Sequence, residues 1–180
     1  MDAIIFEDYD KGLLEEGLIQ AITRSAKKSG VPVFVDPKFR NFMQYGSSTL
    51  FKPNLKELNE ALGLKLEKSD LEGIKAAVSR LRYRMPHDHT VVTLSDNGIV
   101  AFGTDMRMIH HPAHLRKIRD VSGAGDSVVA VLSLAQASGL SLEAASYLAN
   151  LAGGLVCEEV GVVPVTASQL EAALKEASPA

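Results

Sequence analysis

The chain has 180 residues, of which 46% are hydrophobic, and this is enough for one domain with a sizeable core. A formal net charge of −3 offers no basic excess to recruit nucleic acid or an anionic membrane. The single cysteine excludes an intrachain disulfide, and no apolar run approaches the roughly 20 residues that span a bilayer, so we expect a cytoplasmic protein.

Short apolar segments alternate with helical patterns through most of the chain. The apolar runs predict strands at residues 3–6, 32–35, 49–52, 90–94 and 99–103, with a further possible strand at 106–110. The longer periodic or apolar stretches predict helices at residues 13–28, 55–62, 70–84, 124–138, 142–158 and 167–176. This alternation is typical of parallel βαβ units, so we expect an α/β fold.

Two local signals refine this expectation. Asp96-Asn97-Gly98 is a turn of the kind that closes a hairpin, so the strand after it should run antiparallel to the strand before it. The sheet is then mixed but mostly parallel. Ser69 and Glu72 have the spacing of a capping box and predict where the third helix begins.

Polar clusters follow directly after several of the predicted strands. They occupy residues 8–12, 36–38, 53–57 and 93–98. In open α/β sheets, ligands bind outside the carboxyl ends of the strands. We therefore expect these clusters to gather at one ligand-binding edge.

Residues 118–127, Ile-Arg-Asp-Val-Ser-Gly-Ala-Gly-Asp-Ser, place a glycine-rich turn in front of an apolar helix. Small residues let the backbone approach a ligand, and unpaired amides at a helix start favour negative charge. Asp126 beside them offers a carboxylate that can accept a proton, which suits phosphoryl transfer. The alternative is that Asp126 or Ser127 only caps the helix. The spacing fits neither a Walker A loop nor a dinucleotide fingerprint.

The string D-V-S-G-A-G-D-S within this segment resembles the D-T-x-G-A-G-D signature of the ribokinase (PfkB) family of sugar kinases, with Val121 in place of the usual Thr. The resemblance implies a ribokinase-like three-layer α/β/α sandwich and the cofactors ATP and Mg²⁺. It also implies that Asp126 deprotonates the acceptor hydroxyl. The amides of Gly123, Ala124 and Gly125 would form the anion hole for the migrating phosphoryl group.

Asn54 and Glu57 lie three residues apart at a predicted helix start. This spacing alone favours a capping pair. The segment also resembles the N-x-x-E element of the family, which implies that the two side chains order the nucleotide phosphates and hold Mg²⁺ through water.

Two further segments resemble parts of the family's nucleotide site. Thr93, Ser95 and Gly98 are similar to the T-x-G-x-x-G segment that lies against the nucleotide, with Ser95 where glycine is often found. Asn150 lies in a segment similar to the helical A-N-A segment near the adenine. Without the resemblance, Asn150 is simply a polar residue on a small-residue helix face.

Two segments resemble those of the heptose-7-phosphate kinases of the family, which make nucleotide-activated heptose for lipopolysaccharide. The D-Y-D-K-G segment implies that Asp8 and Lys11 bind the sugar phosphate, and the V-D-P-K segment implies that Lys38 contacts the nucleotide. The implied reaction converts the 7-phosphate to the 1,7-bisphosphate. The alternative is that both lysines are solvated loop residues.

The resemblance covers only the carboxy-terminal half or so of a complete family member. We therefore expect residues 1–180 to form a single partial kinase domain, the nucleotide-binding half. One position in the sheet would then be unpaired, which predicts self-association or pairing with an amino-terminal half. Two functions stay open: a sugar kinase, and a non-catalytic nucleotide-binding or assembly module.

Overall fold

The computed structural model describes residues 1–113 and 119–177. The strands are β1 (Ile4–Glu7), β2 (Val33–Asp36), β3 (Leu50–Phe51), β4 (His89–Thr93), β5 (Ile99–Phe102) and β6 (Met108–His111). The helices are α1 (Glu16–Lys28), α2 (Leu55–Leu62), α3 (Leu71–Arg84), α4 (Ala124–Ala137), α5 (Leu142–Val156) and α6 (Ala167–Ala177), with a short 3₁₀ helix at Ser95–Asn97. None of these helices is long and apolar enough to cross a membrane.

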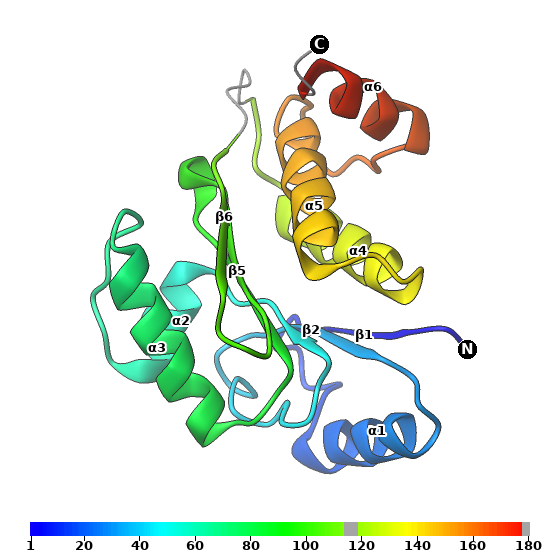
Figure 1. Ribbon diagram of the computed structural model, residues 1–180. Coiled ribbons are helices and arrows are strands. Elements are labelled where there is room, and N and C mark those ends of the chain that lie inside the picture. The colour runs from blue at the N-terminus through cyan, green and yellow to red at the C-terminus, as the bar shows by residue number, and fades with distance from the viewer. Residues whose placement is uncertain (114–118, 178–180) are drawn as a thin grey trace.

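The strands form one sheet in chain order (Figure 1). β1 to β4 are parallel to one another, whereas β4–β5 and β5–β6 are antiparallel pairs. This confirms the mixed, mostly parallel sheet. β1 and β6 are the two edges in the described part of the chain, and Ile5 of β1 is 43% exposed.

The sheet separates two hydrophobic cores because successive strand side chains point to opposite faces. In β2, Val33 and Val35 belong to the core shared with α1, α2 and α3, whereas Phe34 belongs to the core shared with α4 and α5. Figure 1 shows α2 and α3 on the side of β5 and β6 that is opposite to α4 and α5, and α1 on the side of β1 and β2 that is opposite to α4. The structure therefore confirms the expected three layers.

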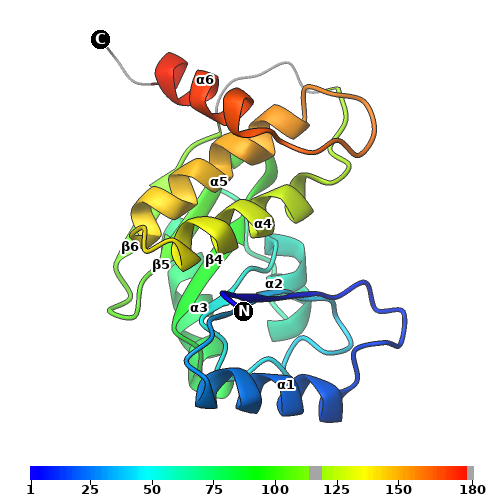
Figure 2. The ribbon, with the colours of Figure 1, turned by 90° about the vertical axis from the view of Figure 1, so that its right-hand side faces the viewer.

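Helix α4 packs tightly on α5 and also contacts β1 and β2 (Figure 2). A Cβ atom on Gly153 of α5 would lie only 2.9 Å from Cγ2 of Val128, so a larger residue would push the two helices apart. This packing brings the first turn of α4 to the carboxyl ends of β1 and β2.

The prediction for the start of α3 was wrong by one residue. Asp70, not Ser69, is the N-cap, and its carboxylate accepts a hydrogen bond from the amide of Gly73 at 2.9 Å. The residue three positions after this cap is a glycine, which has no side chain to return the bond. A capping box therefore cannot form there.

Candidate functional site

A cleft of about 1240 Å³ opens at the carboxyl ends of the parallel strands. The residues expected at this edge that line the cleft are Lys38, Asn54, Thr93, Ser95, Gly98, Ala124, Gly125, Asp126 and Asn150. The structure thus brings together side chains from segments far apart in the sequence. Glu57 is joined to the cleft through Lys38, whereas Gly123, Asp8 and Lys11 are not among the lining residues.

The start of α4 leaves backbone amides open. Its N-cap is Gly123, whose φ of +77° is a left-handed conformation that glycine adopts at little cost, and no side chain in the described part of the chain caps this end. The amide of Ala124 makes a long bond of 3.3 Å to the carbonyl of Val121. Within the described residues, the amides of Gly125 and Asp126 have no hydrogen-bond acceptor. The capping alternative is therefore wrong, and this end of the helix favours an anion.

Asp126 lies in the first turn of α4 and faces two other carboxylates. One oxygen each of Glu7, Asp36 and Asp126 lie within 4.8 Å of one another. Burial and then the charge of Asp126 raise the pKa of Glu7. The Tyr9 hydroxyl donates a hydrogen bond of 2.8 Å to Oδ2 of Asp126, and this bond is the main cause that raises the pKa of Tyr9 to about 12.

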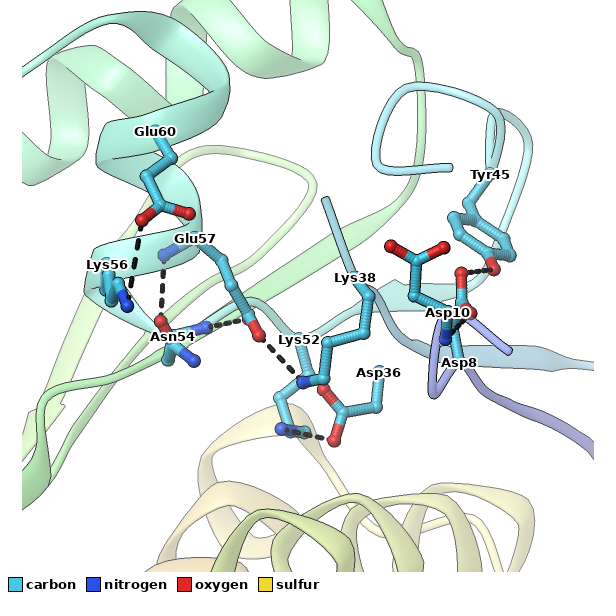
Figure 3. A network of polar contacts seen from close by, with 10 residues as sticks. All are labelled: Asp8, Asp10, Asp36, Lys38, Tyr45, Lys52, Asn54, Lys56, Glu57 and Glu60. Atoms are coloured by element: carbon cyan, nitrogen blue, oxygen red, sulfur yellow. Dashed lines mark hydrogen bonds and ion pairs between the residues drawn. The ribbon is translucent and has the colours of Figure 1, made fainter. Parts of the chain in front are cut away.

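A buried ion pair lies directly beneath this turn. Nζ of Lys52 is 3.0 Å from Oδ2 of Asp36, and both side chains are more than nine-tenths buried (Figure 3). Burial raises the pKa of Asp36 although Lys52 opposes this. A Cβ atom on Gly125 would lie 3.7 Å from both Oδ2 of Asp36 and Nζ of Lys52. The ammonium group of Lys52 therefore adds positive charge beside the open amides.

The sequence reasoning did not single out Lys52, Asp36, Glu7 or Tyr9 as site residues. One signal was available, because Lys52 is a charged residue at the end of an otherwise apolar strand. A lysine there is buried with the strand and requires a buried partner. The positions of Glu7 and Tyr9 depend on how α4 docks, which no local pattern reveals.

Asn54 and Glu57 form a complete capping box at the start of α2. Oδ1 of Asn54 accepts from the amide of Glu57 at 2.8 Å, and Oε2 of Glu57 accepts from the amide of Asn54 at 2.9 Å. Lys38 donates to Oε1 of Glu57 at 2.8 Å (Figure 3). Although burial disfavours its charged form, this bond raises the pKa of Lys38. The capping role that the spacing favours is confirmed, and a role toward Mg²⁺ stays a prediction.

The turn between β4 and β5 forms the adjacent wall of the cleft. Thr93 is joined to Asn54 by a parallel bridge, which extends the register of β3 and β4 to the ends of these strands. Ser95 has a φ of +55°, a left-handed conformation that explains why glycine suits this position. Gly98 has a φ of +81°, and a Cβ atom there would clash with the carbonyl oxygen of His111.

Asn150 and Asp8 hold the protein's own loops. Asn150 on α5 is buried, and its amide donates to the carbonyl of Pro112 at 2.9 Å. The buried Asp8 carboxylate accepts from the Tyr45 hydroxyl at 2.7 Å and from Asn41 at 3.1 Å. These contacts are structural, and any contact of either residue with a ligand stays a prediction.

Relatives of known family cover nearly the whole chain. HldE of Caulobacter vibrioides, a bifunctional protein, is 41% identical over 176 residues, which are 98% of this chain and 36% of that protein. HldE of Azorhizobium caulinodans is 40% identical over 172 residues, or 96% of this chain and 35% of that protein. The chain therefore spans about a third of the length of these relatives.

Solved structures show the same fold. Phosphofructokinase-2 from Escherichia coli in complex with potassium has a TM-score of 0.80 at 21% identity, over 91% of this chain and 53% of its own. Arabidopsis thaliana ribokinase complexed with ribose and ATP has a TM-score of 0.77 at 23% identity, over 89% of this chain and 52% of its own. The expected ribokinase-like fold is thus confirmed.

A family model described as pfkB family carbohydrate kinase matches residues 9–168. The chain therefore belongs to the pfkB family of carbohydrate kinases, which are phosphotransferases that use ATP.

Proposed function

We propose that this chain transfers the γ-phosphoryl group of ATP to a hydroxyl of a sugar phosphate. D-glycero-β-D-manno-heptose 7-phosphate is the proposed acceptor, and the 1,7-bisphosphate is the product. The acceptor rests on the segments at residues 8–12 and 35–38, which lie within the region shared with the HldE proteins. The observation that carries the reaction is the position of Asp126 on the cleft wall, beside open amides in the same helical turn.

Asp126 is the proposed general base. Its carboxylate takes the proton of the acceptor hydroxyl, the hydroxyl oxygen bonds to the γ-phosphorus, and the bond to the bridging oxygen breaks so that ADP leaves with the electron pair. The amide of Gly125 stabilises the transferring group, and those of Gly123 and Ala124 complete the anion hole. Lys52 adds a cation beneath it.

The nucleotide is proposed to lie along the rest of the cleft wall. The proposed nucleotide contacts come from the turn after β4, with Thr93, Ser95 and Gly98, and from Asn150 on α5. Lys38 would place its positive charge beside the phosphates. Lys11 is exposed in the loop after β1 and is proposed to contact the sugar phosphate.

The residues at the start of α2 fit Mg²⁺ held through water. Both carboxylate oxygens of Glu57 already accept a hydrogen bond, but each can accept another from a metal-bound water. Asn54 and Glu57 would hold the ion in this way, since Mg²⁺ keeps several waters. When bound, Mg²⁺ neutralises charge on the phosphates.

Substitution of the base tests the reaction. A positioned base contributes roughly 10²–10⁴ in rate, so Asp126→Ala should lose at least this much of kcat while ATP binding is retained in calorimetry. Asp2→Asn, an exposed position before β1, is the matched control and should keep full turnover. Full activity of Asp126→Ala would show that another group is the base.

A non-catalytic nucleotide-binding module is the second candidate, because the chain spans only about half of the solved kinases it resembles. Titration of ATP and Mg²⁺ with and without heptose 7-phosphate separates the two candidates. A sugar phosphate that changes the ATP affinity supports the kinase. An ATP affinity that is the same with and without the sugar phosphate supports the non-catalytic module.

The exposed edge of the sheet is the proposed association surface. β1 pairs with β2 alone among the described strands, and Ile5 is exposed on it. Open strand edges pair with other chains. If the chain self-associates, Ile5→Lys should therefore lower the weight-average molar mass that sedimentation equilibrium gives at high protein concentration. An unchanged mass would contradict association through β1.

A further inference from the structure

Tyr9 joins the loop after β1 to the start of α4. Its hydroxyl donates to Oδ2 of Asp126 at 2.8 Å, a contact between positions 117 residues apart. The Tyr9 side chain is 58% exposed, so little packing holds it in place. The hydrogen bond, rather than the core, therefore determines where the phenol lies.

The backbone around Tyr9 is fixed on both sides. The amide of Asp8 donates to the carbonyl of Asp36 at 3.0 Å, and its carboxylate is held by Tyr45 (Figure 3). Asp10 is paired with Nε of Arg40 at 3.0 Å, and its own amide donates to Asp8. The side chain of Tyr9 can thus leave Asp126 without any movement of the loop.

A general base must lie within hydrogen-bond distance, about 2.6–3.2 Å, of the hydroxyl that it deprotonates. The phenol of Tyr9 already occupies this place at Oδ2 of Asp126. We propose that Tyr9 is a positioning residue: its hydroxyl holds the Asp126 carboxylate until the acceptor hydroxyl replaces it. This inference rests on the proposed function of Asp126 as the base.

The exchange has an energetic consequence. Only molecules in which the phenol has left can bind the acceptor productively, so the measured affinity for the acceptor falls by the fraction of such molecules. A typical net hydrogen bond corresponds to roughly 2- to 10-fold in an equilibrium constant. Removal of the Tyr9 hydroxyl should therefore strengthen acceptor binding by this factor.

The contact can be measured without any enzyme assay. Tetranitromethane nitrates the phenolate form of tyrosine, and the Asp126 bond, with the charges of Glu7 and Asp36, disfavours that form at Tyr9. Lys52 and Lys38 are the cations that face the same carboxylates and oppose this effect. In Asp126→Ala, nitration of Tyr9 at pH 8 should accelerate roughly 10- to 100-fold when mapped by mass spectrometry.

Tyr83 is the internal control for this measurement, since it is 90% exposed on α3, across the sheet from α4. Its nitration rate should be the same in both proteins. An unchanged rate at Tyr9 in Asp126→Ala would overturn the proposal, whatever the protein catalyses.

Kinetics test the exchange itself. Tyr9→Phe should lower the KM for heptose 7-phosphate roughly 2- to 10-fold with kcat unchanged, and Tyr83→Phe should leave both constants unchanged. A purely structural Tyr9 would instead raise KM or lower kcat, and either result overturns the proposal. If Asp126→Ala is inactive but Tyr9→Phe does not lower KM, this inference alone fails. If Asp126→Ala keeps full turnover, the proposed function fails.

Discussion

Two helices, α2 and α4, begin at the same cleft, and they differ in whether side chains cap the backbone amides of the first turn. The start of α2 is closed by side chains, since Asn54 and Glu57 satisfy each other's amides. The start of α4 has no side-chain cap, and the amides of Gly125 and Asp126 lack acceptors within the described residues. A closed helix end is scaffold, whereas an open end retains its affinity for an anion. This difference supports the proposal that the start of α4 binds the phosphate.

The ion pairs near the two helix starts also differ in burial. Under α4, Lys52 and Asp36 form a buried pair, whereas Lys56 and Glu60 on α2 form an exposed pair of 3.8 Å. The buried pair holds a cation in a fixed place beside the open amides. The exposed pair contributes little to stability, because solvent screens the attraction between its charges.

The largest expected effect comes from breaking the buried pair. Lys52→Met leaves the Asp36 carboxylate buried without its partner, which should lower the free energy of unfolding by about 3–5 kcal/mol in urea denaturation. The matched control Lys56→Met should cost less than about 1 kcal/mol. The double variant Asp36→Asn with Lys52→Met should recover part of the loss. Equal losses for the two lysine variants would contradict the contrast.

The next effect concerns the open end of α4. Gly123→Ala forces a left-handed backbone on a residue with a side chain, and its Cβ would lie 3.2 Å from Val162. The expected loss is about 1–2 kcal/mol in thermal or chemical denaturation. Gly125→Ala is the contrasting variant, because its Cβ meets ordinary contacts inside a helix, and it should gain up to about 1 kcal/mol. Losses of the same size at both glycines would refute the assigned conformations.

The closed end of α2 gives a smaller effect. Asn54→Ala removes the acceptor for the amide of Glu57 and should lower the free energy of unfolding by about 1 kcal/mol. Asn54→Ser keeps a side-chain acceptor at the cap, so its free energy of unfolding should fall by only about a few tenths of a kcal/mol. A larger loss in Asn54→Ser than in Asn54→Ala would show that the cap is not what Asn54 contributes to stability.

Local patterns predicted most of the fold and the polar residues that follow the strands in the wall of the cleft, whereas Asn150 was expected only from the family resemblance. The apolar runs and the Asp96-Asn97-Gly98 turn were sufficient for the mixed sheet, because side-chain alternation and turn chemistry act within a few residues. The polar residues after the strands were found for the same reason. The Tyr9–Asp126 bond could not be predicted, because it depends on how α4 docks against β1 and β2. The Lys52–Asp36 pair instead follows the parallel register of β2 and β3, which the sequence pattern alone did not specify.

The smallest effect depends on pH and tests the crowding of carboxylates at the open end of α4. Burial and the Asp126 charge raise the folded-state pKa of Glu7, so the folded protein binds this proton more strongly than the unfolded chain. The contribution of Glu7 to stability is therefore complete below the ordinary value of 4.5 and is lost as pH rises through the folded-state pKa.

Glu7→Gln removes this dependence. At pH 7 the variant should be more stable than the parent protein by less than about 1 kcal/mol, because the side chain is partly exposed and solvent weakens the repulsion. The difference should shrink as the pH falls toward 4.5, because Glu7 in the folded protein takes up its proton above this value. The effect is measured as the difference in melting temperature between variant and parent from pH 7 to pH 4.5. Glu171→Gln on α6 is the control variant. A difference that grows on acidification would show that Glu7 is stabilised, rather than repelled, by its neighbours at the open end of α4.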